Sequence, residues 1–264
     1  MEELTHIYGF GPQTVARLQA AVPSQALTLA NLRRSAGARG LSARSPHTRA
    51  LARALRNGRR HGQPTFMQTV GLRYHGRWRG AVSRHETGSI VREIARRWRE
   101  SLGERLGITV CGSYRRGSRT SNDVDLVVRH MGPGPTPLTA ADLLAPLRRG
   151  GFVPADGDLV RHPVVRYMGF CRLPGHRWFR RLDIVWVPTN DRAQLPATVL
   201  ALTGSADFNR ALRNRARELG IRLGSNSIRW ADDTDSSPFP YAILRTERDI
   251  FRLLGVPYLA PQDR

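Results

Sequence analysis

The 264 residues suffice for one large domain or for two to three small subdomains, and a hydrophobic share of 40% fits a globular fold. The formal net charge of +21 predicts a polyanionic partner such as nucleic acid. An alternative explanation for so large a charge is a bias of the sequence toward arginine. Lysine is absent, which excludes chemistry through a lysine Schiff base. The sequence shows no long apolar run and no leader pattern, so we expect a chain that is neither membrane-spanning nor secreted.

The N-terminal residues predict a glycine hairpin that leads into a helix. Gly9 and Gly11 permit a tight turn, and Pro12 suits the first turn of a helix that ends near Ala21. Such a hairpin points backbone N–H groups at a phosphate, although an ordinary helix start has the same pattern.

The first third of the chain is strongly basic. Residues 1–82 hold 13 arginines and only two acids, which favours a nucleic acid partner over a merely soluble surface. We expect a short helix at 27–34, a loop rich in Gly, Ser and Ala at 36–46, and an arginine-rich helix from there to about Arg60.

A long amphipathic helix is expected next, from Ser83 to about Leu102. Ser83 and Glu86 form a capping-box pattern, in which a hydroxyl caps the helix and a glutamate follows three residues later. The apolar residues of this helix recur at helical spacing, namely Ile90, Ile94 and Trp98.

The segment that follows has the features of a phosphate-transfer site. An apolar strand at 108–111 leads to a Gly112-Ser113 turn and a basic segment, after which Asp123 and Asp125 open a second apolar run at 126–128. Because residues two apart on a strand point to the same face, the two carboxylates project together. Mg²⁺ prefers carboxylate oxygen and is often shared with substrate phosphates, so the pattern predicts nucleotidyl transfer.

The next elements contain a third acid. We expect a helix at 139–149 and two strands, at 164–173 and 178–187, joined by a turn near Pro174-Gly175. The second strand holds Asp183 between apolar neighbours, and an acid in that position needs a partner or a metal because burying a bare charge is costly.

The C-terminal quarter predicts helices at 191–202 and 205–219, one strand near 221–230 and a last helix from Thr246 to Leu254.

The two cysteines, Cys111 and Cys171, lie in apolar strand-like runs, and Cys and His show no metal-ligand spacing. We expect buried, reduced thiols and an intracellular protein.

Several motifs carry a family resemblance: VGLRYHG at 70–76, CGSYRRG at 111–117, NDVDLVV at 122–128, RRLDIVWVP at 180–188, LTGSADFN at 202–209 and ERDIFRLLGVPYLAPQDR at 247–264. In this order they closely resemble the family X DNA polymerases. The resemblance covers residues 1–35 and 66–264 and leaves 39–65 poorly matched.

This resemblance implies an α+β fold. A nucleotidyltransferase-type palm, a mixed sheet with helices, would occupy residues 82–188. A helical fingers domain with a helix-hairpin-helix motif would occupy 1–81, and a small α+β thumb that binds the nucleotide would occupy 189–264.

The resemblance also implies a two-metal site. Asp123 and Asp125 would bind two Mg²⁺ or Mn²⁺ ions, and Asp183 would complete the catalytic ion's site and help to deprotonate the primer 3′-hydroxyl. Arg181 would steer the primer end. The residues implied in nucleotide binding are Gly112, Ser113, Arg116, Ser121, Asn122, Ala201, Leu202, Gly204, Asn209 and Arg213.

Contacts to DNA are implied as well. Arg210 matches a position that contacts the nucleotide or the templating strand, although its helix is alternatively a plain arginine-faced surface. The backbone amides of Gly9, Gly11, Gln13 and Thr14 would hold the primer phosphate. The carbonyls of three residues would bind a monovalent cation, Na⁺ or K⁺, namely Thr5, Ile7 and Phe10.

The function implied is a monomeric, DNA-directed DNA polymerase that fills short gaps with dNTPs in DNA repair, including base excision repair, in the nucleus or cytoplasm. Three departures from the family suggest a permissive, low-fidelity enzyme. Ala201-Leu202 stands where the family has an aromatic pair, and these smaller side chains leave room for a 2′-hydroxyl. Ala81 stands where the family has an arginine, which Arg79 or Arg84 could replace. Ser225-Asn226 stands where the family has an acidic-aromatic pair.

The chain also begins at the fingers hairpin and holds no lysine, so we expect no removal of 5′-deoxyribose phosphate. In this it resembles reduced family members of large DNA viruses, whose place of action would be the viral replication site. Two alternatives stay open: template-independent terminal transfer, which the short turn near Pro174 disfavours, and a non-catalytic DNA-binding protein, which the three acids disfavour.

Overall fold

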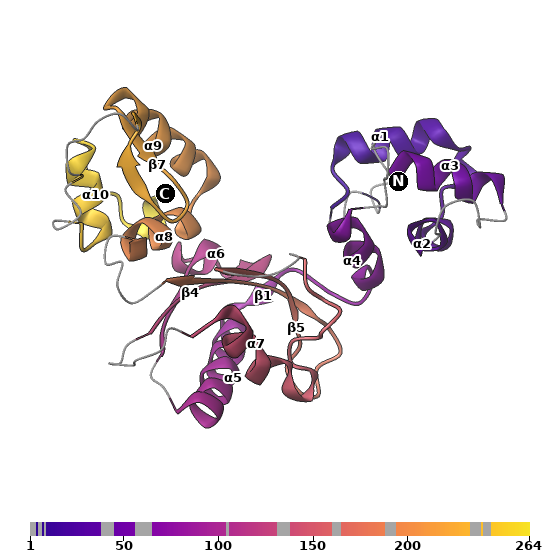
Figure 1. Ribbon diagram of the computed structural model, residues 1–264, viewed down its shortest axis with the longest axis horizontal. Helices are drawn as coiled ribbons and strands as arrows, with labels where there is room; N and C mark the ends of the chain where they lie inside the picture. The colour runs from indigo at the N-terminus through magenta and orange to yellow at the C-terminus, as the bar shows by residue number, and fades with distance from the viewer. Residues whose placement is uncertain are drawn as a thin grey trace. The chain divides into compact units, whose positions relative to one another are not determined.

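The computed structural model describes residues 4, 7, 9–37, 45–55, 65–103, 106–130, 138–159, 165–187, 194–232, 239 and 244–264. The chain forms two compact units, one of Met1–Trp78 with Pro154–His162 and one of Arg79–Val153 with Pro163–Arg264 (Figure 1). Among the described helices, none combines the length and the apolar character needed to cross a bilayer. The predicted boundary between palm and thumb lies inside the second unit and stays a prediction.

The first unit is helical. It contains α1 (Pro12–Ala21), a 3₁₀ turn (Ser24–Ala26), α2 (Leu29–Gly37), α3 (Pro46–Leu55) and α4 (Phe66–Tyr74). The start of α1 at Pro12 confirms the predicted helix, and α2 begins two residues later than expected. The predicted extension of the third helix to Arg60 lies outside the described residues. Helix α4 was not predicted, although Thr65 and Gln68 cap it with a complete capping box that the sequence contains.

Helix α3 belongs to the core of this unit. It lies in the segment that family resemblance left unmatched, yet Leu51, Ala52 and Leu55 are at most 1% exposed. Leu51 and Leu55 share a core with residues of the N-terminal hairpin and of α1, including Phe10 and Leu18. Helix α3 is therefore an integral part of the unit, with its remaining side facing outward.

The second unit is built on a four-stranded mixed sheet. Its strands are β2 (Leu106–Val110), β4 (Asp123–His130), β5 (Arg166–Cys171) and β6 (Arg180–Val187), in the order β2-β4-β6-β5. Strands β4 and β6 run parallel, and the other pairs are antiparallel. A separate short pair joins β1 (Val82–Ser83) to β3 (Thr120–Ser121). This mixed sheet with helices confirms the predicted α+β class.

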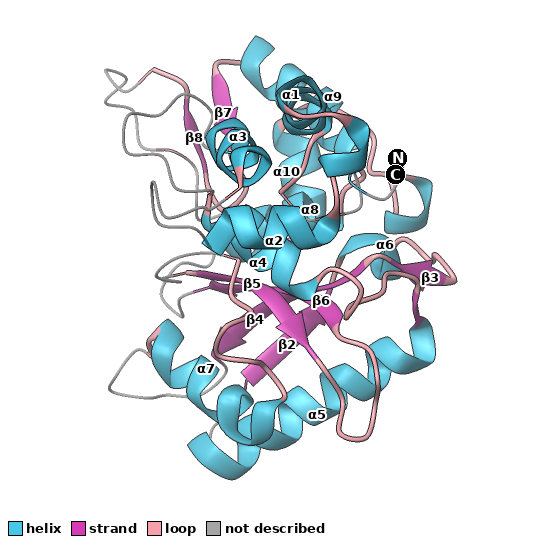
Figure 2. Cartoon of the chain, turned by 90° about the vertical axis from the view of Figure 1, so that its right-hand side faces the viewer, coloured by secondary structure: helices cyan, strands magenta, loops and turns pink. Residues whose placement is uncertain are grey.

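One face of the sheet is apolar and covered by α5 (Arg84–Leu102) and α7 (Ala140–Arg148), which lie on the same side of the strands (Figure 2). The alternate residues of β4 and β6 that point to this side include Leu126 and Ile184, both fully buried. The apolar residues of α5 that the sequence predicted at helical spacing pack against these strand residues, namely Ile90, Ile94 and Trp98. Side chains of the intervening residues therefore emerge on the opposite face.

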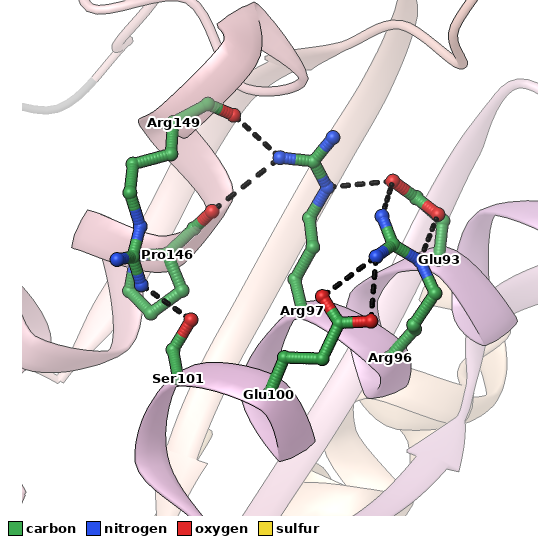
Figure 3. A network of polar contacts seen from close by, with 7 residues as sticks. All are labelled: Glu93, Arg96, Arg97, Glu100, Ser101, Pro146 and Arg149. Carbon is green, nitrogen blue, oxygen red and sulfur yellow. Dashed lines mark hydrogen bonds and ion pairs between the residues drawn. The ribbon is translucent and has the colours of Figure 1, made fainter.

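A polar network joins the two covering helices at their C-terminal ends (Figure 3). Arg97 of α5 donates to Glu93 at 2.7 Å and to the carbonyl oxygens of Pro146 and Arg149 at the end of α7. Arg149 in turn donates to the hydroxyl of Ser101. Because the last carbonyls of a helix lack partners within it, Arg97 supplies the hydrogen bonds that α7 would otherwise obtain from water.

The C-terminal part of this unit comprises α8 (Gln194–Thr203), α9 (Ala206–Glu218), β7 (Ile221–Leu223), β8 (Ile228–Trp230), α10 (Glu247–Leu253) and a final 3₁₀ turn (Pro261–Asp263). The single strand predicted at 221–230 is wrong, because the structure has a hairpin there. Gly224 donates its N–H to the carbonyl of Ser227 at 2.8 Å, and the Gly-Ser-Asn-Ser sequence favours a turn.

Candidate active site

Three aspartates come together on the face of the sheet opposite to α5 and α7. In the parallel register of β4 and β6, Asp125 lies opposite Asp183, and Asp123 lies opposite Arg181. Asp123 shares a face with Asp125 because it is two residues away on the same strand. One carboxylate oxygen from each aspartate lies within 4.8 Å of the others, as the sequence predicted.

The acids repel one another in this arrangement. Burial, followed by the charges of Asp123 and Asp183, raises the pKa of Asp125 to about 7. Burial and the charge of Asp183 likewise raise the pKa of Asp123. Two guanidinium groups, Arg181 and Arg166, offset part of this effect. A cluster of carboxylate oxygens with incomplete positive compensation fits hard divalent cations such as Mg²⁺ or Mn²⁺.

Both oxygens of Asp183 accept hydrogen bonds from arginine. Arg181 donates to Oδ1 at 2.7 Å from its own strand and is almost fully buried. Arg166, from the edge strand β5, donates to Oδ2 at 3.2 Å with 43% of its side chain exposed. The sequence did not indicate Arg166, because its place beside the acids depends on the register of β5 against β6.

The predicted Gly112-Ser113 turn is the one-turn helix α6 (Gly112–Arg115). Gly112 has a φ of +58°, and a Cβ at this position would lie 2.0 Å from Oδ2 of Asp125, so only glycine fits. Ser113 donates to the hydroxyl of Ser121 at 2.9 Å. Three of the predicted nucleotide-binding residues thus lie at the acid cluster, whereas Asn122 is exposed beside Gly80.

The two arginines after this turn connect α6 to the C-terminal part of the unit. Arg116, a predicted nucleotide ligand, donates to the carbonyl of Thr203 at 2.5 Å and lies against Gly204. Arg115, which the sequence did not single out, pairs with Glu247 through two bonds of 2.5 and 3.0 Å. Burial alone would raise the pKa of Glu247, but hydrogen bonds from Arg115 and Arg264 hold it below its usual value.

The remaining predicted nucleotide residues lie on α8 and α9. Leu202 packs against an apolar cluster that includes Cys111 and Val127. The side chain of Asn209 donates to the carbonyl of Ala201 at 2.8 Å. One face of α9 forms a groove of about 420 Å³ that contains the predicted ligands, lined by Ala206, Asn209, Arg210, Arg213, Asn214 and Arg217.

The two arginines considered as substitutes at Ala81 have separate locations. Ala81 itself has a φ of +55°. Arg84 stacks 3.9 Å from the ring centroid of Tyr114 and donates to its carbonyl, so it lies at α6. Arg79 stacks on Trp178, 4.0 Å from the ring centroid, in the β5–β6 connection. Arg84 is therefore the one that lies beside the predicted phosphate turn.

Part of the predicted glycine hairpin lies among the described residues of the first unit. Gly9 has a φ of +85°, and a Cβ there would lie 3.1 Å from the backbone nitrogen of Gln68, so the hairpin packs closely against α4. Gly11 caps α1, and the N–H of Thr14 donates to its carbonyl at 2.9 Å. Gln13 is exposed in the first turn.

Of the predicted monovalent-cation ligands, Thr5 lies outside the described residues. The carbonyl of Ile7 accepts a hydrogen bond from the N–H of Phe10 at 3.0 Å, which closes the hairpin turn.

Comparison with known proteins shows two family matches. Residues 81–189 match the DNA polymerase beta palm, and residues 198–264 match the DNA polymerase beta thumb. DNA polymerase lambda of Rattus norvegicus is 33% identical over 227 residues, which cover 80% of this chain and 38% of that protein. DNA-directed DNA/RNA polymerase mu of Homo sapiens is 27% identical over 232 residues, covering 76% and 44%.

A solved structure shares the fold. Leishmania infantum polymerase beta, in a ternary P/T complex, superposes with a TM-score of 0.72 and 24% identity over 100% of this chain and 97% of that one. The chain spans about two fifths of the length of the curated relatives that it matches.

Replacing Gly112 with Ala will destabilise the fold more than the same change at Gly117. Both glycines have positive φ angles, +58° and +88°, so each substitution carries a backbone cost of about 1–2 kcal/mol. Only at Gly112 does the new methyl group collide with a carboxylate, which adds about 1–3 kcal/mol, whereas Gly117 has open space. Urea unfolding measures both, and equal losses would contradict the close contact with Asp125.

Replacing Asp125 with Asn will stabilise the metal-free protein at pH 8. The folded pKa of Asp125, about 7, lies above its ordinary value of 3.8, so the folded state binds this proton more tightly. The stability that Asp125 contributes is therefore lost as pH rises from about 4 to about 7, and an uncharged Asn escapes the loss. We expect a gain on the order of 2–4 kcal/mol at pH 8 that shrinks toward pH 5.

Unfolding in EDTA across this pH range measures the effect. Asp142 is the matched control, since hydrogen bonds from Thr139 lower its pKa and Asp142→Asn should reduce stability above the ordinary pKa. A loss of stability in Asp125→Asn at pH 8 would show that the acids do not repel one another.

Proposed function

The chain belongs to family X of the DNA polymerases, and on this premise we propose that it is a DNA-directed DNA polymerase that adds deoxynucleotides to a primer 3′-hydroxyl. Its substrates are gapped or primer–template DNA and dNTPs, and it acts as a monomer inside the cell. The observation that carries the proposal is the acid cluster, in which oxygens of Asp123, Asp125 and Asp183 lie within 4.8 Å of one another beside α6.

The three aspartates are the residues that would hold two divalent cations. Bound Mg²⁺ or Mn²⁺ supplies charge stabilisation to both the attacking primer oxygen and the triphosphate leaving group. Arg181 orients Asp183 by holding its Oδ1, which keeps this carboxylate beside the other two acids. In this arrangement, the Asp183 carboxylate accepts the proton of the primer 3′-hydroxyl.

The triphosphate would be held by the groups around α6. Gly112 brings the start of the helix against Asp125, so the proposed phosphate ligands would lie next to the proposed metal ligands. Ser113 and Ser121 present paired hydroxyls, and Arg84 adds a guanidinium at the same helix. Arg116 lies between this turn and Gly204, and so links nucleotide binding to the thumb helices.

DNA would be gripped without sequence readout. The hairpin at Gly9 and Gly11 offers N–H groups at the start of α1 to a backbone phosphate. The excess of arginine in residues 1–82 supports this grip, and the arginine face of α9 supports contact with the templating strand. Because such binding releases counterions, the affinity for DNA should fall steeply with salt.

Short-gap filling in DNA repair with low selectivity is the finer part of the proposal. Ala201 and Leu202 offer little bulk against the sugar of an incoming nucleotide, and Leu202 turns toward the apolar cluster of Cys111 and Val127. A 2′-hydroxyl therefore meets less steric resistance than it would against an aromatic pair. We do not propose lyase chemistry through a Schiff base, since the 264 residues hold no lysine.

Replacing Asp183 with Ala will reduce primer extension to background while DNA binding stays within about twofold, because the acid acts on the ions and the 3′-hydroxyl rather than on the duplex. Extension on gapped, primer–template and template-free substrates, with anisotropy for binding, measures both. Asp142→Asn on the exposed start of α7 is the matched control and should extend normally.

The same substrates separate the alternatives. Full extension by Asp183→Ala would refute the mechanism, extension without template would indicate a terminal transferase, and binding without any extension by the wild-type chain would indicate a non-catalytic DNA-binding protein.

Ribonucleotides will be incorporated at an efficiency within about a few hundredfold of deoxynucleotides, since steric exclusion by a small side chain is weak. Single-nucleotide insertion with each dNTP and rNTP measures the ratio. Ala201→Tyr restores bulk at the member of the pair that does not pack in the apolar cluster, and it should raise the preference for dNTP. A wild-type preference of several thousandfold would mean that the backbone alone excludes the hydroxyl.

A further inference from the structure

Arg166 is a cation already present in the acid cluster. It lies on the edge strand β5, where Met168 pairs with Asp183, and alternation places Arg166 on the same face as the acids. Its Nη2 lies 3.2 Å from Oδ2 of Asp183, while Arg181 occupies Oδ1. Asp183 therefore has no oxygen that is without an arginine partner.

The two arginines differ in how firmly they are held. Arg181 is 6% exposed, bonds at 2.7 Å and belongs to the same strand as its partner. Arg166 is 43% exposed, bonds at a longer distance and comes from the edge of the sheet. Long, partly exposed ion pairs contribute little to stability and their side chains move readily, so Arg166 is the arginine that can move away from Asp183.

We propose that Arg166 is a resident counter-ion that holds Oδ2 of Asp183 in the metal-free protein and is displaced by the divalent cation. The inference rests on the proposed metal site and adds a residue that competes for it. Mg²⁺ needs its ligand oxygens at about 2.0–2.1 Å in near-octahedral geometry, which leaves no room for a guanidinium directed at the same oxygen lone pairs. Like charge between the cation and Arg166 acts in the same direction.

The charges of the cluster give this residue its role. Three carboxylates face two guanidinium groups in the described part of the site, so loss of Arg166 leaves a single positive partner. In the metal-free protein, Arg166 reduces repulsion among the acids and so stabilises the fold. In the metal-bound protein, the same charge weakens binding of the cation. Arg166 thus stabilises the empty site at the expense of metal affinity.

Binding of Mn²⁺ to the DNA-free chain, followed by the EPR signal of free Mn²⁺, tests the proposal without any polymerase assay. Arg166→Met should tighten Mn²⁺ binding by about fivefold, the equivalent of one weak ion pair. Arg166→Lys keeps the charge and should bind Mn²⁺ as the wild type does. Unchanged or weaker binding by Arg166→Met would overturn the proposal.

Arg172→Met is the matched control, because it removes one positive charge from the residue that follows β5, where Arg172 lies over the ring of Phe179 at 4.6 Å. It should leave Mn²⁺ affinity unchanged. If it tightened binding as much as Arg166→Met, the effect would belong to net charge and the proposal would fail. In an Asp183→Asn background, Arg166→Met should change Mn²⁺ affinity less than it does in the wild type, since the bond to that carboxylate is lost while the charge of Arg166 still acts on Asp123 and Asp125.

Thermal unfolding supplies a second readout. In EDTA, Arg166→Met should melt at a lower temperature than the wild type, and saturating Mn²⁺ should remove this difference. A difference of the same size with and without Mn²⁺ would indicate only a structural role for Arg166 and would overturn the proposal. If no variant bound Mn²⁺, the proposed metal site would fail together with this inference. If the wild type bound Mn²⁺ and Arg166→Met bound it no more tightly, this inference alone would fail.

Discussion

The parallel register of β4 against β6 is the constraint on which the site depends. It sets Asp125 opposite Asp183 and leaves Asp123 two residues along the same face. Because side chains alternate, the same register sends Leu126 and Ile184 into the core under α5 and α7. A slip of one residue would bury the acids and expose the core, so the apolar face of the sheet holds the three acids in this arrangement.

Arginine provides much of the polar bonding between elements in this chain. Arg97 bonds the end of α7, Arg180 bonds Glu86 together with the carbonyls of Arg79 and Gly80, and Arg115 bonds Glu247. A guanidinium has five donors in a rigid fork, so one side chain satisfies several orphan carbonyls or both oxygens of a carboxylate. The basic composition therefore serves the fold, and net charge alone overstates the positive surface that is left for a polyanionic partner.

Elements with local signals were predictable, and contacts that depend on register were not. Ser83, Ser205 and Thr246 cap helices where the sequence predicted them, since a cap and its helix are neighbours in sequence. The three acids were also predictable, because alternation fixes Asp123 and Asp125 and motif resemblance adds Asp183. Arg166 and Arg115 were missed, because their partners lie 17 and 132 residues away and no local pattern specifies them.

Glu247 shows how α6 and the C-terminal helices are held in one arrangement. It accepts from Arg115, which follows the turn at Gly112, and from Arg264 at the end of the chain. Arg116, the next residue, bonds the carbonyl of Thr203 where α8 ends. A triphosphate that attracted Arg116 would remove that bond but leave the Glu247 pair intact. Consecutive arginines thus make separate contacts, since Arg115 anchors α6 to α10 while Arg116 bonds the end of α8, and under the proposed function a triphosphate would compete only for Arg116.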